Sequence, residues 1–175
     1  MDPVASMIVV SAERMLSLSE ALLKGVPADK FARFAAPGGA AVEANHASFV
    51  YGHLSIYPSW ILSMLGQDAS AVTPSDEYKA LFEHGKPCLD DVDGTIYPAQ
   101  GEVVDLFNRS YRAAIDAVGG MTAAQLQGPS GIEGDFGAIF PRAGDIANFM
   151  LVGHSMMHLG QMSTWRRAIG LGPAM

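Results

Sequence analysis

The sequence predicts an all-α fold: an antiparallel four-helix bundle with long connecting loops and short extra helices, formed by residues 1–175 as a single domain. Four long segments repeat apolar residues with the period of a helix. No segment shows the alternation of a strand, and glycine and proline gather between the four segments. Hydrophobic residues make up 49% of the 175 positions and charged residues 17%, which is enough for one packed core.

The first two helices are expected over residues 4–23 and 42–65. Apolar residues recur in the first at Val4, Ile8, Met15, Leu16, Leu22 and Leu23, and in the second at Val50, Leu54, Ile61 and Leu65. Pro58 falls inside the second segment, where it removes one backbone hydrogen bond. Because the apolar period resumes after it, we expect a kink there and not the end of the helix.

The third helix is expected over residues 100–118, after a less regular stretch. Within that stretch, Ser75 is a candidate N-cap of a short helix that stops at Gly85, and a loop follows. In the third helix, the residues expected to face inward are Val103, Phe107, Tyr111, Ala114 and Val118.

The last helix is expected over residues 143–169, after one helical turn at 122–127 and a glycine-rich loop at 128–141. One of its faces carries Ile146, Met150, His154, His158, Gln161 and Trp165. The long first and second connections indicate that the helices need not follow a simple up-down-up-down order.

Charge and composition exclude several functional classes. A net charge of −7 and a pI near 5.0, without a basic run, argue against nucleic acid and anionic membranes as partners. Asp2, Glu13 and Arg14 interrupt the N-terminal segment, so no signal peptide is expected, and no apolar run is long enough to span a membrane. The single cysteine, Cys88, excludes an intramolecular disulfide and predicts a reducing cytoplasmic location.

Three histidines form the candidate site. His154 and His158 are four residues apart on one face of the last helix, and His53 has apolar neighbours on the second. A lone histidine of this kind is more often a core residue bonded to a carbonyl. Three together predict one divalent cation, which would offset the cost of burying them and leave a coordination position open.

The residue pattern narrows the metal class. The residues between His154 and His158 include no glutamate, which excludes the His-Glu-x-x-His zinc peptidases. The central turns lack the carboxylates of a di-iron bundle, and structural zinc sites need more cysteines. A mononuclear three-histidine site remains, for which Zn²⁺, Ni²⁺ and Fe²⁺ are all chemically admissible.

Two stretches resemble the DinB-like (YfiT/DinB) metalloenzyme superfamily: NHASFVYGHLSIYPSWILSMLG from Asn45, and HSMMHLGQMSTWRRAIG from His154. Members of that family are four-helix bundles with one histidine on the second helix and His-x-x-x-His, then x-Gly-Gln, on the last. The matching residues here are His53, His154, His158, Gly160 and Gln161. The resemblance implies a metal, with Zn²⁺ or Ni²⁺ favoured over Fe²⁺. It also implies a small-molecule substrate, such as a low-molecular-weight thiol held as thiolate for transfer, or hydrolytic chemistry.

Two neighbours of the ligands are candidate catalytic residues. Tyr57, one turn after His53, could donate a hydrogen bond to a metal-bound group, or it could be a packed aromatic. Gln161, one turn after His158, could contact a bound ligand or orient an imidazole, or serve only in helix packing. His46 could be a fourth ligand or a proton shuttle, but a polar residue near the helix start is the favoured interpretation.

Other polar and aromatic residues receive structural interpretations. His84 ends the short helix, and Cys88 lies in a loop without a histidine partner. Trp60 and Trp165 are expected in the core or in a pocket wall, and Arg166 and Arg167 on a solvated face.

The leading hypothesis is a metal-dependent thiol transferase or hydrolase. The alternative is a non-catalytic metal-binding or stress-response bundle, which the lack of an identifiable general base favours. Haem binding ranks last, because two histidines on one helix are poorly placed to ligate opposite haem faces. Apolar residues on the outer helix faces could support a homodimer.

Overall fold

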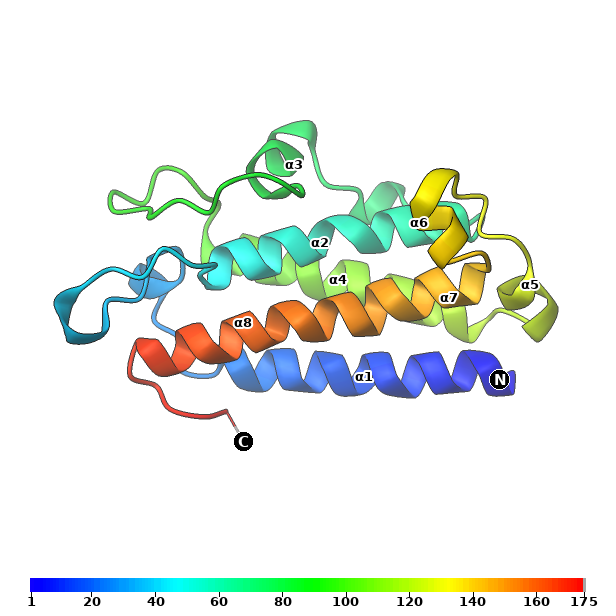
Figure 1. Ribbon diagram of the computed structural model, residues 1–175, viewed down its shortest axis with the longest axis horizontal. Coiled ribbons are helices and arrows are strands. Elements are labelled where there is room, and N and C mark those ends of the chain that lie inside the picture. The colour runs from blue at the N-terminus through cyan, green and yellow to red at the C-terminus, as the bar shows by residue number, and fades with distance from the viewer. Residues whose placement is uncertain (175) are drawn as a thin grey trace.

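The computed structural model describes residues 1–174 and is all-helical, with no strand among these residues. Four long helices lie side by side in Figure 1. They are α1 (Pro3–Leu23), α2 (Ala47–Met64), α4 (Gln100–Gly119) and a last helix that includes α7 (Ala143–Asn148), η4 (Phe149–His154) and α8 (Ser155–Ala168). Three short 3₁₀ turns lie in the connections, at Ala28–Lys30, Pro37–Gly39 and Ser70–Val72. The predicted all-α class is confirmed.

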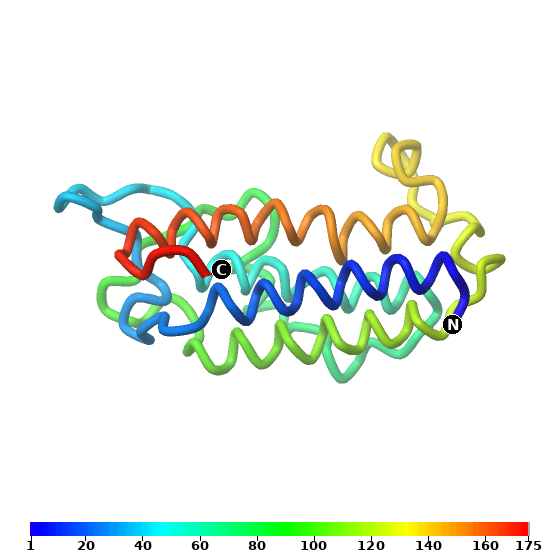
Figure 2. Tube along the Cα trace, turned by 90° about the horizontal axis from the view of Figure 1, so that it is seen from below, coloured from blue at the N-terminus to red at the C-terminus, as the bar shows by residue number. Residues whose placement is uncertain are grey.

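The four helices pack so that α1 and α2 each contact both α4 and α8. Figures 1 and 2 show that α2 and α4 run in the same direction, opposite to α1 and the last helix. Antiparallel packing therefore holds for α1 with α4 and for α2 with α8. The other two neighbouring pairs are parallel. The 35-residue connection from Leu65 to Ala99 makes this order feasible, because it carries the chain back along the length of the bundle.

The core residues expected on α4 are all fully buried, and so are Val50, Leu54 and Ile61 on α2. Val4 was expected in the core but is 37% exposed, in the first turn of α1. Helix α2 continues through the buried Pro58 to Met64, as expected. Trp60 is a correction: it is 37% exposed on the outer side of α2 and does not line the core.

Helix α2 begins at Ala47, five residues later than expected. The preceding segment is held as a turn instead, because Val42 N–H donates to the Ala35 carbonyl and Gly38 and Gly39 have positive φ. His46 then caps the helix: its Nδ1 accepts a hydrogen bond from the Phe49 N–H at 3.2 Å.

The connections carry the short helices α3 (Asp76–Phe82), α5 (Ala123–Gln127) and α6 (Gly134–Ile139). Ser75 caps α3 as expected, but that helix ends at Phe82, before Gly85. Helix α6 corrects the expectation of a continuous loop. Its Gly137 is required, because a Cβ there would overlap the carbonyl of Ile132.

The last helix contains a π-helical segment, η4, that the sequence did not predict. A side chain stabilises this segment, because Ser155 Oγ donates a hydrogen bond to the Met150 carbonyl, five residues earlier, at 2.9 Å. Tyr111 of α4 lies 2.7 Å from the same Oγ. The extra residue in this turn rotates the preceding part of the last helix relative to α8. His154 is the last residue of η4.

Arg166 lies in the interior and not on the expected solvated face, with 8% exposure. Its guanidinium donates to the carbonyls of Leu22 and Lys24, at the end of α1, and to that of Gly172. These are carbonyls that a helix end leaves without partners, so Arg166 joins α1, α8 and the C-terminal segment. Arg167 is exposed as expected.

Among the described residues, no helix combines the length and the apolar composition that crossing a membrane requires.

Candidate metal centre

The fold brings the three predicted ligands together. His53 comes from the middle of α2, His154 ends η4 and His158 lies one turn further on α8. Each offers one ring nitrogen, and these three nitrogens lie within 4.8 Å of one another. The Nε2 atoms of His154 and His158 are 3.1 Å apart. Two nitrogens at about 2.0–2.1 Å from a tetrahedral Zn²⁺ would be about 3.3 Å apart, so this spacing suits a shared cation.

His53 is oriented by the end of α3. Its Nδ1 lies 2.7 Å from the carbonyl oxygen of Phe82, and a carbonyl can only accept, so Nδ1 carries the proton and donates. The lone pair is therefore on Nε2, which faces the other histidines. Gly52 makes this contact feasible, because a Cβ at that position would overlap the ring of Phe82.

His158 is oriented by Gln161. Its Nδ1 lies 3.0 Å from Oε1 of Gln161, and that oxygen also accepts a hydrogen bond from Nδ2 of Asn45 at 3.0 Å. Because the Asn45 bond identifies this atom of Gln161 as the amide oxygen, it can only accept from His158. The His158 proton is therefore on Nδ1 and the lone pair on Nε2. Such contacts orient metal-binding histidines and make them better ligands.

His154 lacks such a partner. Its Nδ1 is buried and makes no hydrogen bond within the described residues. Burying an imidazole with one nitrogen unsatisfied is costly. The other nitrogen, Nε2, lies with the ring nitrogens of His53 and His158, so a cation bound there would give it a partner and would fix the His154 proton on Nδ1. The donor set therefore fits a divalent metal, and it consists of neutral nitrogen ligands alone.

The electrostatics keep these ligands neutral. Burial, with His158 close by, lowers the pKa of His53 to about 4. Burial, with His158 and His53 close by, lowers the pKa of His154 to about 3. Burial also lowers the pKa of His158, although its bond to Gln161 acts in the opposite direction. Near neutral pH all three are therefore unprotonated, which is the form that binds metal.

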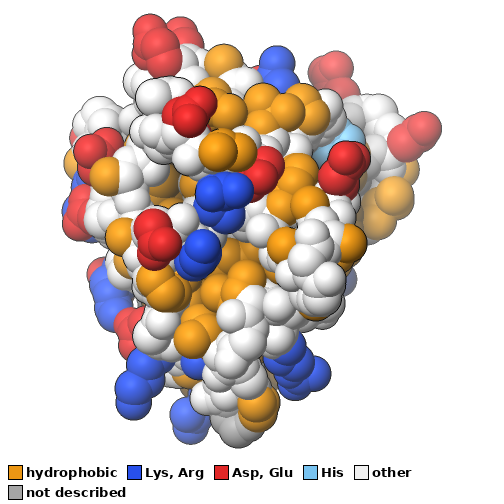
Figure 3. Space-filling model, turned by 90° about the vertical axis from the view of Figure 1, so that its left-hand side faces the viewer, with side chains coloured by type: hydrophobic (Ala, Val, Ile, Leu, Met, Phe, Trp, Pro, Cys, Tyr) orange, Lys and Arg blue, Asp and Glu red, His pale blue; other side chains and the backbone are white. Residues whose placement is uncertain are grey.

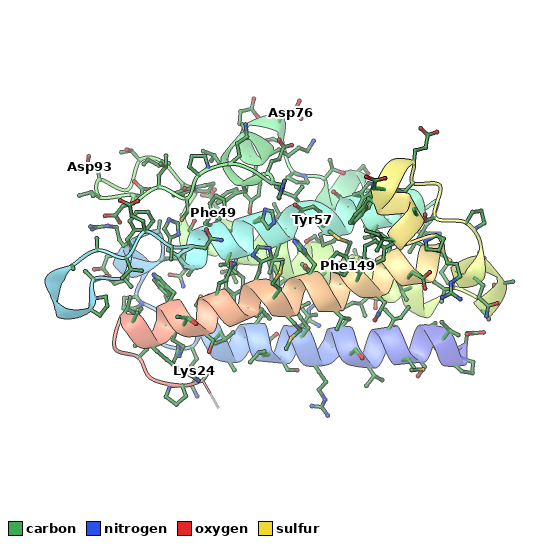
Figure 4. All side chains as sticks on the ribbon, viewed as in Figure 1. Lys24, Phe49, Tyr57, Asp76, Asp93 and Phe149 are labelled. Carbon is green, nitrogen blue, oxygen red and sulfur yellow. The ribbon has the colours of Figure 1, made fainter. Side chains whose placement is uncertain are left out.

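The histidines line a cavity of about 630 Å³, which is within the usual range for small-molecule sites. One wall is apolar, formed by Phe49, Phe136, Phe149, Met150 and Met157. The other side is polar, formed by residues that follow α3: Glu83, His84, Gly85 and Lys86. Figure 4 labels Phe49 and Tyr57 on α2 and Phe149 on the last helix, on the facing sides of the two helices.

Tyr57 lies inside this cavity. Its hydroxyl is 3.3 Å from Nε2 of His53, and its ring packs edge-on against His53 and His154. Burial, with Glu83 nearby, raises the pKa of Tyr57, so its hydroxyl stays protonated and can donate. Gln161 does not line the cavity; it is placed to position His158.

His46 lies outside the cluster. It is fully buried, and its Nε2 is 2.9 Å from the Leu89 carbonyl, so both ring nitrogens are used in capping and loop contacts. His84, by contrast, lines the metal cavity. Cys88 does not line it; its thiol lies 3.8 Å from the Ala44 carbonyl, and burial raises its pKa to about 11.

Several site residues escaped the sequence-based reasoning. Asn45, Glu83 and Phe149 carry no motif, and the Phe82 contact uses a main-chain carbonyl, which any residue type would provide. One signal was present: Phe82 and Glu83 end a short helix, and helix ends leave carbonyls without partners.

Searches against models of protein families, curated proteins and solved structures find no match to this chain.

Proposed function

We propose that this chain is a DinB-like four-helix bundle and a metal-dependent enzyme. His53, His154 and His158 hold one divalent cation, Zn²⁺ or Ni²⁺ in preference to Fe²⁺. The substrate is a small molecule, and the site activates a low-molecular-weight thiol or water for transfer or hydrolysis.

The observation that supports this proposal most strongly is the orientation of the imidazoles. Two of them, His53 and His158, are each held at Nδ1 by an oxygen, so their Nε2 lone pairs point to a common space. Core histidines that need only hydrogen-bond partners would not require this convergence. The all-nitrogen donor set suits Zn²⁺, Ni²⁺ and Fe²⁺, and the resemblance to the DinB-like family favours the first two.

A cation held by the three histidines would lower the pKa of a thiol or water bound to it, and the nucleophile near neutral pH would be the resulting thiolate or hydroxide. The residues of the chain do the rest. The Tyr57 hydroxyl is positioned to donate a hydrogen bond to negative charge that develops on the bound group. The aromatic wall that includes Phe49 and Phe149 excludes water and leaves the side with Glu83 and Lys86 for polar parts of the substrate.

The alternative is a metal-binding bundle without enzymatic activity. The described residues of the cavity include one carboxylate, that of Glu83, and it lies on the exposed rim. The enzyme hypothesis is favoured by the cavity itself, since a purely structural three-histidine site would not need a space of about 630 Å³ beside it.

The first experiment measures the metal content of protein purified without a polyhistidine tag, together with His53→Ala and His154→Ala. We expect about one equivalent of metal in the wild type and its loss in both variants. His46→Ala is the matched control, because His46 is also a buried histidine but lies outside the cluster, and it should retain the metal. A wild type that binds no metal even after addition of Zn²⁺ and Ni²⁺ would contradict the proposal.

The second experiment separates the enzyme from the binding protein. Cobalt-substituted protein is titrated with small thiols, and a thiolate-to-cobalt absorption band should appear. With an alkyl halide added as co-reactant, the loaded protein should then transfer the alkyl group to these thiols, with release of halide, faster than free cobalt does. Tyr57→Phe should retain the metal but lose much of that rate, by about 10²-fold. A thiol band without any acceleration would favour the non-catalytic alternative.

A further inference from the structure

A second cavity lies beside the metal centre. It has a volume of about 410 Å³ and is bounded by the segment before α2 and by the C-terminal half of α8. The first wall includes Ala35, Val42 and Ala44, and the second Gln161, Trp165 and Ala168. We call this cavity the α8 slot. In Figure 1 its two walls are the loop at the left, before α2, and the left half of α8.

The α8 slot is apolar along most of its length because its walls are built from small side chains. Alanines at three positions leave room beside the Trp165 ring. That ring is fixed, since its Nε1–H donates to the Arg33 carbonyl at 2.9 Å, and it is only 4% exposed. A fixed indole beside small residues forms a surface on which a flat or aliphatic group can pack. Figure 3 views this end of the molecule and shows hydrophobic side chains between the charged ones.

The slot and the metal cavity share a wall. Asn45 lines both cavities, and its Nδ2 donates to Oε1 of Gln161, which lines the slot. The same oxygen holds His158, which lines the metal cavity. The hydrogen-bonded amides of Asn45 and Gln161 therefore lie where the two spaces adjoin.

We propose that the α8 slot binds the apolar arm of the substrate whose reacting group lies at the three histidines. The arm is an aromatic ring or a short branched aliphatic group that packs on Trp165, and the amides of Asn45 and Gln161 bind a polar linkage between the arm and the reacting group. This inference rests on the proposed function for the reacting group, and on the shared wall for the arm. It predicts a substrate with two ends, one a thiol or a hydrolysable group and the other apolar.

The slot is tested first without metal. The chain has two tryptophans, so labelling with 5-fluorotryptophan gives two ¹⁹F signals, which Trp60→Phe assigns. Titration with benzyl alcohol, which carries no thiol, should shift the Trp165 signal in a saturable way and leave the exposed Trp60 unchanged. Ala168→Leu should abolish the shift by filling the slot, while Ala80→Leu on the exposed face of α3 should not. A Trp165 signal that does not respond overturns the proposal.

The link to the metal centre is tested on cobalt-loaded protein with 2-phenylethanethiol and ethanethiol. The thiolate band should appear at a roughly tenfold lower concentration of 2-phenylethanethiol than of ethanethiol. Such a difference in affinity corresponds to the burial of part of one ring. Ala168→Leu should remove that preference without weakening ethanethiol. Equal affinities overturn the proposal. A missing band with both thiols overturns the thiol chemistry instead, and the slot then depends on the Trp165 response alone.

Discussion

Nδ1 of His158 lies 3.0 Å from Oε1 of Gln161, so the amide oxygen holds the imidazole by the nitrogen that is turned away from the other two histidines. Asn45 fixes that oxygen in turn, at 3.0 Å. The hydrogen bonds that orient this candidate ligand therefore extend from α8 to the segment before α2. Gln161 acts on the candidate site through His158 and is a positioning residue.

Gln161→Ala should weaken metal binding. Without the amide oxygen, the His158 proton is free to shift to Nε2, the nitrogen that binds the cation, and we expect a loss of about 10–100-fold in affinity. Gln161→Glu keeps an acceptor and should bind at least as well as the wild type. Competition with a chromophoric chelator measures both. Gln67→Ala, at an exposed position, is the control, and an unchanged affinity in Gln161→Ala would contradict this role.

Gly52→Ala should damage both the fold and the site. The added Cβ would overlap the ring of Phe82, and pushing that ring away moves the carbonyl that holds His53. We expect a loss of about 1–3 kcal/mol in the free energy of unfolding, with weaker metal binding. Gly160→Ala is the matched control, because no atom lies within 4 Å of its Cβ on the same kind of helix. That variant should gain about 0.5–1 kcal/mol. Urea unfolding and chelator competition distinguish the two.

The metal-free protein should lose stability on acidification. The pKa of His53 is about 4 and that of His154 about 3 in the fold, both below the value of about 6.5 in an unfolded chain. Below about pH 6.5 the unfolded state therefore binds more protons, and the free energy of unfolding falls as the pH decreases through this window. Above it these groups have no effect.

This pH dependence is measured by urea unfolding in the presence of a chelator, at about pH 7 and about pH 5, where most carboxyl groups are still ionised. His154→Phe should flatten the decline, because it removes one of the groups that must stay neutral. Added Zn²⁺ should stabilise the wild type more at the higher pH, since protons compete for the same nitrogens. Equal stability of the metal-free wild type at both values would show that the histidines are not buried as described.

Much of the fold could be predicted because the four long helices carry their own apolar period. The inward residues of α4, such as Val103 and Tyr111, follow that period without exception. The predictions of burial were wrong for residues whose surroundings depend on another segment of the chain. Arg166 reads as a surface residue on α8, and only the packing of α1 beside it reveals the carbonyls that it binds. Trp60 follows the apolar pattern of α2, yet its side chain is 37% exposed.

The clustering of the three histidines could be predicted because histidines are few and His154 and His158 have the spacing of one helix face, but the contacts that orient them could not. The contact of His53 with the Phe82 carbonyl joins residues 29 positions apart and leaves no trace in side-chain identity. The start of α2 shows a similar limit. The sequence from Val42 onward suits a helix, but the bond from Val42 to Ala35 and the His46 cap delay it, and this leaves Asn45 free to bind Gln161.

Ser155→Ala should disturb the π-helical segment and, through it, the metal site. Ser155 Oγ donates to the Met150 carbonyl and lies 2.7 Å from the Tyr111 hydroxyl, and both hydroxyls are fully buried. Removing Oγ leaves the tyrosine hydroxyl and a carbonyl unsatisfied, at a cost of about 1–3 kcal/mol. Because His154 ends this segment, a relaxation to regular α-helix would rotate it away from His53 and weaken metal binding. Tyr111→Phe, which keeps the bond to Met150, should lose only about 1 kcal/mol and retain the metal. Urea unfolding and metal content of the two variants test this order, and equal metal loss in both would show that the π-helical geometry does not set the position of His154.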